Sequence, residues 1–123
     1  LKLFPGITES AVKNILNHPE TEAVILETFG AGNAPTTKWF LSALAEAIER
    51  GVLILNVSQC VGGSVDLGRY ETSKALKDLG VLSAQDMTFE ASLTKLMFVL
   101  AHVEDKAERI ALITSNLRGE LSV

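Results

Sequence analysis

The chain has 123 residues, a formal net charge of −4 and one cysteine. This length suits one domain with a single core, and the acidic balance with scattered basic residues gives no reason to expect nucleic acid as a partner. A lone cysteine excludes an internal disulfide and a cysteine-rich zinc site, and it favours a cytoplasmic location.

No apolar run approaches the roughly 20 residues that span a bilayer, so we expect no membrane partner. The chain opens on Leu1-Lys2-Leu3-Phe4-Pro5-Gly6, without an initiator methionine, and we interpret this opening as a short strand in a piece of a longer protein. Because 47% of the residues are hydrophobic, we expect some apolar surface to cover a partner.

Strands and helices alternate along the chain, as proline, glycine and capping residues indicate. After the opening strand we expect a helix capped by Thr8 and ended by His18-Pro19, a strand over 22–28, a helix from near Pro35 to Gly51, a strand over 52–57, a helix over 70–79, a short strand at 81–82, a helix after the capping segment 86–88, and a last helix over 106–116. This order predicts the α/β class: a small three-layer α/β/α domain around a short parallel sheet, Rossmann-like or flavodoxin-like.

Apolar residues recur at helical spacing in these helices. They are Ala11, Val12, Ile15 and Leu16 in the first helix, Trp39, Phe40, Ala43, Leu44, Ala47 and Ile48 in the second, Ala91, Leu93, Leu96, Met97 and Leu100 after segment 86–88, and Ile110, Ile113 and Leu117 in the last.

Two of the expected strands end in loops of glycine and polar residues. Glu27-Thr28-Phe29-Gly30-Ala31-Gly32-Asn33-Ala34-Pro35 follows one strand, and Ser58-Gln59-Cys60-Val61-Gly62-Gly63-Ser64 follows the next. The carboxyl ends of parallel strands meet at one edge of a sheet, where open α/β domains bind ligands. The sequence therefore predicts a binding crevice with these loops on either side.

The residues of this chain do not form an evident catalytic constellation. His18 and His102 lie near helix ends, with no serine or cysteine nucleophile at a structured turn beside them. The segment Gly30-Ala31-Gly32 lacks the third glycine of a dinucleotide fingerprint, and its loop has no phosphate-binding lysine.

The carboxylates near strand and loop ends have turn, cap and surface roles that account for them without a metal ion. They are Glu27, Asp66, Glu71 and Asp86. We therefore expect neither a metal nor a cofactor.

Two other polar residues at the strand ends have open interpretations. Cys60 fills a small half-buried space, contacts a ligand or acts as a nucleophile. Asn33 is either a turn or capping residue before Ala34-Pro35 or a group that recognises a small polar ligand, because its amide both donates and accepts hydrogen bonds.

With these residues in view, the chain resembles the C-terminal domain of the L-asparaginases, most closely that of the cytoplasmic type I enzymes. Five stretches in the family's order carry the resemblance: Leu3-Phe4-Pro5-Gly6, Phe29-Gly30-Ala31-Gly32-Asn33-Ala34-Pro35, Asn56-Val57-Ser58-Gln59-Cys60, Asp86-Met87-Thr88-Phe89-Glu90-Ala91 with Thr94-Lys95-Leu96, and Asn116-Leu117-Arg118-Gly119-Glu120.

The resemblance implies hydrolysis of L-asparagine to aspartate and ammonia by an N-terminal catalytic domain that this chain lacks, so the fragment alone is expected to be inactive. It also implies that this domain closes the active site of a neighbouring subunit in a homodimer or tetramer. The implied substrate-binding residues are Asn33, in the Gly-x-Gly-Asn turn, and Glu71, whose carboxylate would face the α-ammonium group of the substrate.

Some bacterial type I enzymes have a second, regulatory asparagine site. It involves an arginine at the end of the strand that corresponds to 22–28 here and a cysteine after Ser/Thr-Gln. Cys60 matches that cysteine, but Glu27 stands where the arginine would be and reverses the charge that a ligand carboxylate would meet. We treat Glu27 and Cys60 as a possible effector site at which regulation by asparagine is not expected.

Two alternatives remain at this point. The chain is similar to the asparaginase-like subunit of a tRNA-dependent amidotransferase, although its few basic residues give no indication of tRNA contact. It also fits a non-catalytic α/β module for binding or dimerisation.

Overall fold

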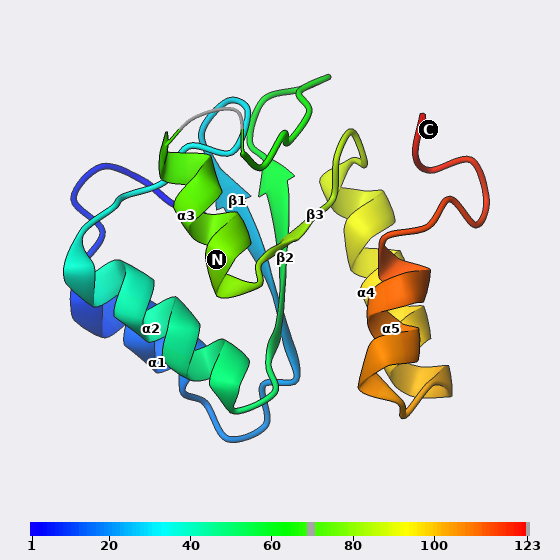
Figure 1. The fold of residues 1–123 in the computed structure, drawn as a ribbon, viewed down its shortest axis with the longest axis horizontal. Coiled ribbons are helices and arrows are strands. Elements are labelled where there is room, and N and C mark those ends of the chain that lie inside the picture. The colour runs from blue at the N-terminus through cyan, green and yellow to red at the C-terminus, as the bar shows by residue number, and fades with distance from the viewer. Residues whose placement is uncertain (69–70, 123) are drawn as a thin grey trace.

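The computed structural model describes residues 1–68 and 71–122. A parallel sheet with strand order β1-β2-β3 lies between two layers of helices (Figure 1). In chain order the elements are α1 (Glu9–Leu16), β1 (Ala23–Thr28), α2 (Lys38–Glu49), β2 (Leu53–Ser58), α3 (Glu71–Leu79), β3 (Leu82–Ser83), α4 (Phe89–His102) and α5 (Lys106–Ile113). The predicted three-layer α/β fold is confirmed.

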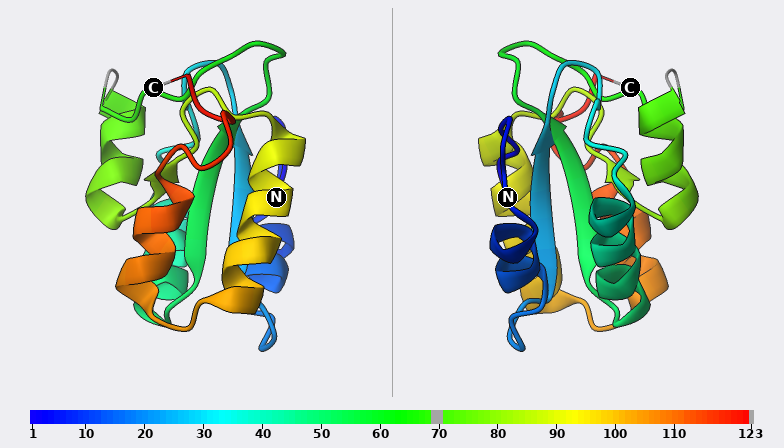
Figure 2. Two further views of the ribbon diagram at one scale, coloured as in Figure 1. Left: turned by 90° about the vertical axis from the view of Figure 1, so that its right-hand side faces the viewer. Right: turned by 90° about the vertical axis from the view of Figure 1, so that its left-hand side faces the viewer.

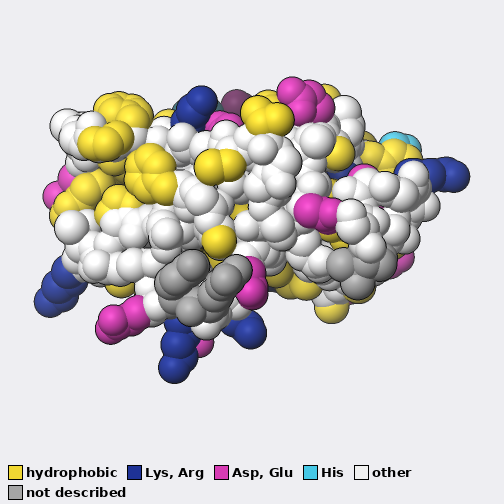
Figure 3. All heavy atoms as spheres, turned by 90° about the horizontal axis from the view of Figure 1, so that it is seen from above, with side chains coloured by type: hydrophobic (Ala, Val, Ile, Leu, Met, Phe, Trp, Pro, Cys, Tyr) yellow, Lys and Arg dark blue, Asp and Glu magenta, His cyan; other side chains and the backbone are white. Residues whose placement is uncertain are grey.

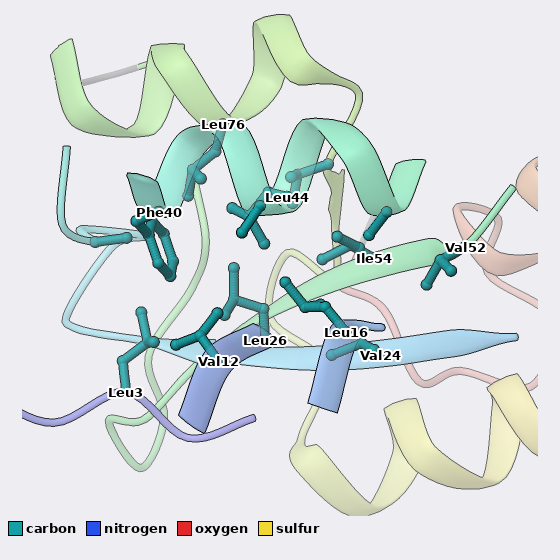
Figure 4. Packing of buried hydrophobic residues seen from close by; sticks show 14 residues of the cluster. Leu3, Val12, Leu16, Val24, Leu26, Phe40, Leu44, Val52, Ile54 and Leu76 are labelled. Carbon is teal, nitrogen blue, oxygen red and sulfur yellow. The ribbon is translucent and has the colours of Figure 1, made fainter. Parts of the chain in front are cut away.

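The two faces of the sheet carry separate hydrophobic clusters, because successive side chains of a strand point to opposite faces. Val24 and Leu26 of β1 pack with residues of α1, α2 and α3, including Phe40 and Leu76 (Figure 4). Ile25 packs on the other face with residues of α4 and α5. Both faces of the sheet are therefore covered, as the apolar strand sequences require.

The opening strand is shorter than expected. Lys2 forms a single parallel bridge to Glu27, in which the N–H of Glu27 donates to the carbonyl of Leu1 at 2.9 Å and the N–H of Leu3 donates to the carbonyl of Glu27 at 3.1 Å. These first residues lie on the β1 side of the sheet (Figure 2).

Threonine hydroxyls cap two helices as predicted. Thr8 accepts from the N–H of Ala11 at 3.3 Å, and Thr88 accepts from the N–H of Ala91 at 3.1 Å. The predicted start of the third helix at position 70 lies outside the described residues.

Several predicted boundaries are wrong by one to three residues, and specific bonds explain three of them. The second helix begins at Lys38 rather than near Pro35, because Thr37 has an extended ψ of 142° and accepts the first helical bonds. The third strand begins at Leu82, since the N–H of Val81 donates to the carbonyl of Leu76 and closes α3. The last helix ends at Ile113, where the hydroxyl of Thr114 bonds back to the carbonyl of Ile110.

A buried ion pair fixes the segment after α5. The ammonium of Lys95 lies 2.5 Å from Glu120 Oε1 and also donates to the carbonyl of Ser115, and the two charged side chains are only 6% and 12% exposed. Glu120 accepts further bonds from the N–H groups of Leu117 and Arg118. The Lys95 bond and these backbone donors lower the pKa of Glu120 from 4.5 to about 2.

Candidate functional site

A closed turn at the carboxyl end of β1 positions Asn33. The N–H of Phe29 donates to the carbonyl of Asn33 at 2.9 Å, and the N–H of Asn33 donates back to the carbonyl of Phe29 at 2.8 Å. Gly30 and Gly32 have φ angles of 50° and 114°, which glycine adopts without the steric cost of a Cβ. The Asn33 side chain is consequently held at an exposed, well-defined point of the edge.

The loop after β2 packs directly against this turn. Ser58 Oγ donates to the carbonyl of Gly30 at 2.6 Å, and the N–H of Asp66 donates to the carbonyl of Ala31 at 3.1 Å. A Cβ on Gly32 would lie 3.3 Å from Val65 Cγ1, so the approach is close. The two loops share one edge of the sheet, as predicted.

The sequence predicts a crevice between these two loops. That prediction is wrong, because hydrogen bonds between the loops hold them together. A hollow of ≈ 510 Å³ lies instead beside β3, where Val65, Leu67, Ser83 and Gln85 line it. The Asn33 turn is thus braced by the second loop rather than separated from it.

Asn33 reaches the start of α3 through its side chain. Thr72 Oγ1 donates to Asn33 Oδ1 at 2.8 Å, and Thr72 lies in the first turn of α3 directly after Glu71. The amide nitrogen of Asn33 has no hydrogen-bond partner among residues 1–68 and 71–122, so it remains a free donor on an exposed residue.

The sequence analysis selected Asn33 and Glu71 as substrate-binding residues but missed Thr72. The structure brings Asn33 to the helix start that bears Glu71, whose side chain is exposed. Only the position of Thr72 beside Glu71 pointed to it, because a contact between a loop and a distant helix has no local sequence pattern.

Glu27 and Cys60, the possible effector pair, lie on neighbouring segments. Glu27 is half-buried inside β1, between Lys2 and Val57, and Cys60 is exposed two residues after the end of β2. Gln59 directly precedes Cys60, and its side chain donates to the backbone carbonyl of Glu27 at 2.9 Å. Within the described part of the chain, no hydrogen bond joins the Glu27 carboxylate to the Cys60 thiol.

A buried polar pair lies under the Asn33 turn. Thr28 Oγ1 donates to Asn56 Oδ1 at 3.0 Å, and both residues are fully buried. This bond joins the ends of β1 and β2, and the amide nitrogen of Asn56 has no partner among the described residues. A buried bond of this kind keeps the two strand ends, and hence the two loops, in register.

The other predicted carboxylates are dispersed. Asp66 holds the loop through its backbone, and Asp86 Oδ1 accepts from the N–H of Ser122 at 3.1 Å. In the described ranges no three His, Cys, Asp or Glu side chains gather as a metal site would require, and no helix is long and apolar enough to cross a membrane.

The sequence profile of the Glutaminase/Asparaginase C-terminal domain matches residues 1–112. The chain belongs to this family. L-asparaginase 1 of Escherichia coli K12 is 43% identical over 120 residues, which are 98% of this chain and 35% of that protein.

Solved structures agree with this family membership. The crystal structure of L-asparaginase I from Vibrio cholerae superposes with a TM-score of 0.93 at 41% identity, covering 100% of this chain and 37% of that one.

A relative of another class is also similar in sequence. One subunit of the glutamyl-tRNA(Gln) amidotransferase of Thermococcus kodakarensis is 31% identical over 122 residues, or 99% of this chain and 27% of that protein. The chain therefore spans between 27% and 37% of the length of these relatives.

Proposed function

We propose that this chain is the C-terminal domain of a cytoplasmic, homo-oligomeric L-asparaginase, in which a separate N-terminal domain carries the residues that hydrolyse L-asparagine to aspartate and ammonia. The observation that carries the proposal is the exposed Asn33 amide, which its turn and Thr72 hold in place and whose nitrogen bonds to no described residue. An amide donor in this position suits the carboxylate or side-chain carbonyl of a small amino acid.

Glu71 has a complementary role in this proposal. Its exposed carboxylate at the start of α3 would attract the α-ammonium group of asparagine when the domain meets the catalytic domain of a neighbouring subunit. A donor on Asn33 and an acceptor on Glu71 together match the opposite charges of an amino acid's two α-substituents.

The test is release of ammonia from free asparagine by the full-length protein, beside the 123-residue chain at equal concentration. We expect activity in the full-length protein and none in the chain alone. If neither is active and both are folded, the amidotransferase or the non-catalytic module replaces this proposal. Activity of the full-length protein that needs a second subunit and charged tRNA favours the amidotransferase.

We also propose that Glu27 and Cys60 do not form an effector site for asparagine. The carboxylate of Glu27 would repel that of the ligand, so turnover should depend hyperbolically on asparagine concentration. Steady-state rates over a wide concentration range check this expectation, and sigmoidal saturation would show that the charge at position 27 does not decide the matter.

A further inference from the structure

The turn after β1 fixes the backbone of Asn33 but not the direction of its amide. Both backbone polar groups of Asn33 bond to Phe29, so rotation about the two side-chain torsions is left to side-chain contacts. Among residues 1–68 and 71–122 this side chain makes one hydrogen bond, which Thr72 Oγ1 donates to Asn33 Oδ1 at 2.8 Å. The direction of the exposed amide therefore depends on Thr72.

That direction matters because the two ends of an amide differ in chemistry. The nitrogen donates hydrogen bonds and the oxygen accepts them, although the two ends are nearly equal in size. A hydroxyl proton given to Oδ1 holds the oxygen of Asn33 toward α3. The nitrogen, which has no partner in the described ranges, is then the end that a ligand can meet.

The place of Thr72 in its helix makes the hydroxyl proton available. Inside a helix, a threonine hydroxyl often bonds back to a carbonyl three or four residues earlier. Thr94 of α4 does so, with donation to the carbonyls of Glu90 and Ala91 at 2.9 and 3.2 Å. Thr72 is the second residue of α3, so the carbonyls three and four residues before it lie outside that helix. Its hydroxyl donates to Asn33 instead.

Packing of α3 gives Thr72 a fixed position. The next residue, Ser73, and Leu76 are fully buried, and Leu76 belongs to the same hydrophobic cluster as Phe40 of α2. Ser73 Oγ also accepts from the N–H of Gly68 at 3.2 Å. Because threonine is branched at Cβ, few side-chain rotamers remain open to it in a helix. The hydroxyl of Thr72 is therefore a fixed point against which the amide is set.

We propose that Thr72 is a positioning residue, whose hydroxyl orients the Asn33 amide so that its nitrogen meets an oxygen acceptor of a small amino acid. The inference rests on the proposed function and adds to it the group that orients the donor. The same bond ties the Asn33 turn to the helix start that carries Glu71, so the donor and the carboxylate belong to one hydrogen-bonded unit. Figure 1 shows the two segments at the same end of the sheet.

Steady-state kinetics of the full-length protein test this role. Thr72→Val keeps the branched shape and removes the donor, so the KM for asparagine should rise about fivefold with little change in kcat. Thr72→Ser keeps the hydroxyl and should hold the KM within about twofold of the unsubstituted protein. Thr94→Val, at an exposed position of α4, is the matched control and should leave the KM unchanged.

A double-mutant cycle separates positioning of Asn33 from a general effect on α3. In the Asn33→Ala protein, Thr72→Val should cause no further rise in KM, because the group that it orients is absent. An equal rise in both backgrounds would overturn the positioning role, since Thr72 would then act without Asn33. A KM that Thr72→Val leaves unchanged, or that Thr72→Ser fails to restore, would also overturn it.

A measurement without turnover tests the bond itself. In full-length protein labelled with ¹⁵N-asparagine, the side-chain order parameter of Asn33 should be near ~0.8, should fall below about 0.6 in Thr72→Val, and should be kept in Thr72→Ser. Activity on asparagine without this fall overturns the positioning role alone. Inactivity with this fall overturns the enzyme function alone and supports the orientation of the amide by Thr72, and inactivity without it overturns both.

Discussion

Asn33 combines a fixed position with a side-chain donor that no residue in 1–68 or 71–122 uses. The hydroxyl of Thr72 donates to its side-chain oxygen, and its backbone N–H and C=O both bond to the backbone of Phe29. Few rotamers remain accessible to a side chain held in this way, so a ligand bound to its nitrogen would lose little additional conformational entropy.

Replacement of Asn33 by alanine in the full-length protein should raise the KM for asparagine about tenfold, which corresponds to one hydrogen bond to a charged group. The fold should be unaffected because the residue lies on an exposed turn. Steady-state kinetics measure the change, and Asn14→Ala, on the exposed side of α1, is the control. A KM equal in both variants would remove Asn33 from the site.

Glu120 provides a prediction at acidic pH. Its folded-state pKa of about 2 is below its ordinary 4.5, so its ionisation stabilises the folded state above pH 4.5, and this contribution is lost as the pH falls toward 2. Glu120→Gln should therefore lower the free energy of unfolding by about 2 kcal/mol at pH 7, with a smaller difference at each step toward pH 2. Denaturant unfolding across this range checks it, and a difference independent of pH would show that charge is not the cause.

The elements differ in how far their sequences determine them. Thr8 and Thr88 mark helix starts correctly, because the residue that caps the helix lies next to it. The apolar face of α2 is also predicted correctly, with Phe40, Ala43 and Leu44 buried. Signals that act within one turn of a helix can be found in the sequence.

The errors have two kinds of cause, one within the helix concerned and one in contacts between distant segments. α2 starts late because Thr37 has an extended ψ of 142°, and α5 ends early because polar side chains compete for its last carbonyls. In the candidate site, the order of the strands predicted the shared edge, but neither the Thr72 contact nor the Lys95–Glu120 pair has a local pattern. Those contacts depend on tertiary packing.

The Asn33 turn should be sensitive to any side chain at Gly32. Alanine there adopts an unfavourable φ of 114° and places its Cβ 3.3 Å from Val65 Cγ1, so the free energy of unfolding should fall by about 2 kcal/mol. Gly30→Ala, with φ of 50° and open space around its Cβ, should lose about 1 kcal/mol. Thermal unfolding of both variants measures the difference, and equal losses would mean that the contact with Val65 is easily relaxed.

At the scale of the whole molecule, the carboxyl edge of the sheet carries large apolar side chains that are exposed. Phe4, Phe29 and Val61 are exposed by 55%, 36% and 106% and follow the three segments that end there. Figure 3 looks down on this edge and shows hydrophobic side chains gathered over part of it. Under the proposed function, a neighbouring subunit covers them.

Val61→Asp should consequently weaken self-association of the full-length protein, with a rise of about tenfold or more in the dissociation constant. Analytical ultracentrifugation over a dilution series measures this change. Ala101→Asp, an exposed position near the end of α4, serves as the control. If the two variants associate equally, the subunit contact lies elsewhere.

The side chain of Gln59 donates to the carbonyls of both Leu3 and Glu27, at 2.7 and 2.9 Å, and so adds a side-chain link to the backbone bridge between the first residues and β1. Deamidation would convert its donor into a carboxylate facing two carbonyl oxygens, and the repulsion would separate the first residues from β1. The chemical ageing of a single amide would thus loosen the edge of the sheet, and the slow accumulation of a species one mass unit heavier would mark protein whose fold has begun to open there.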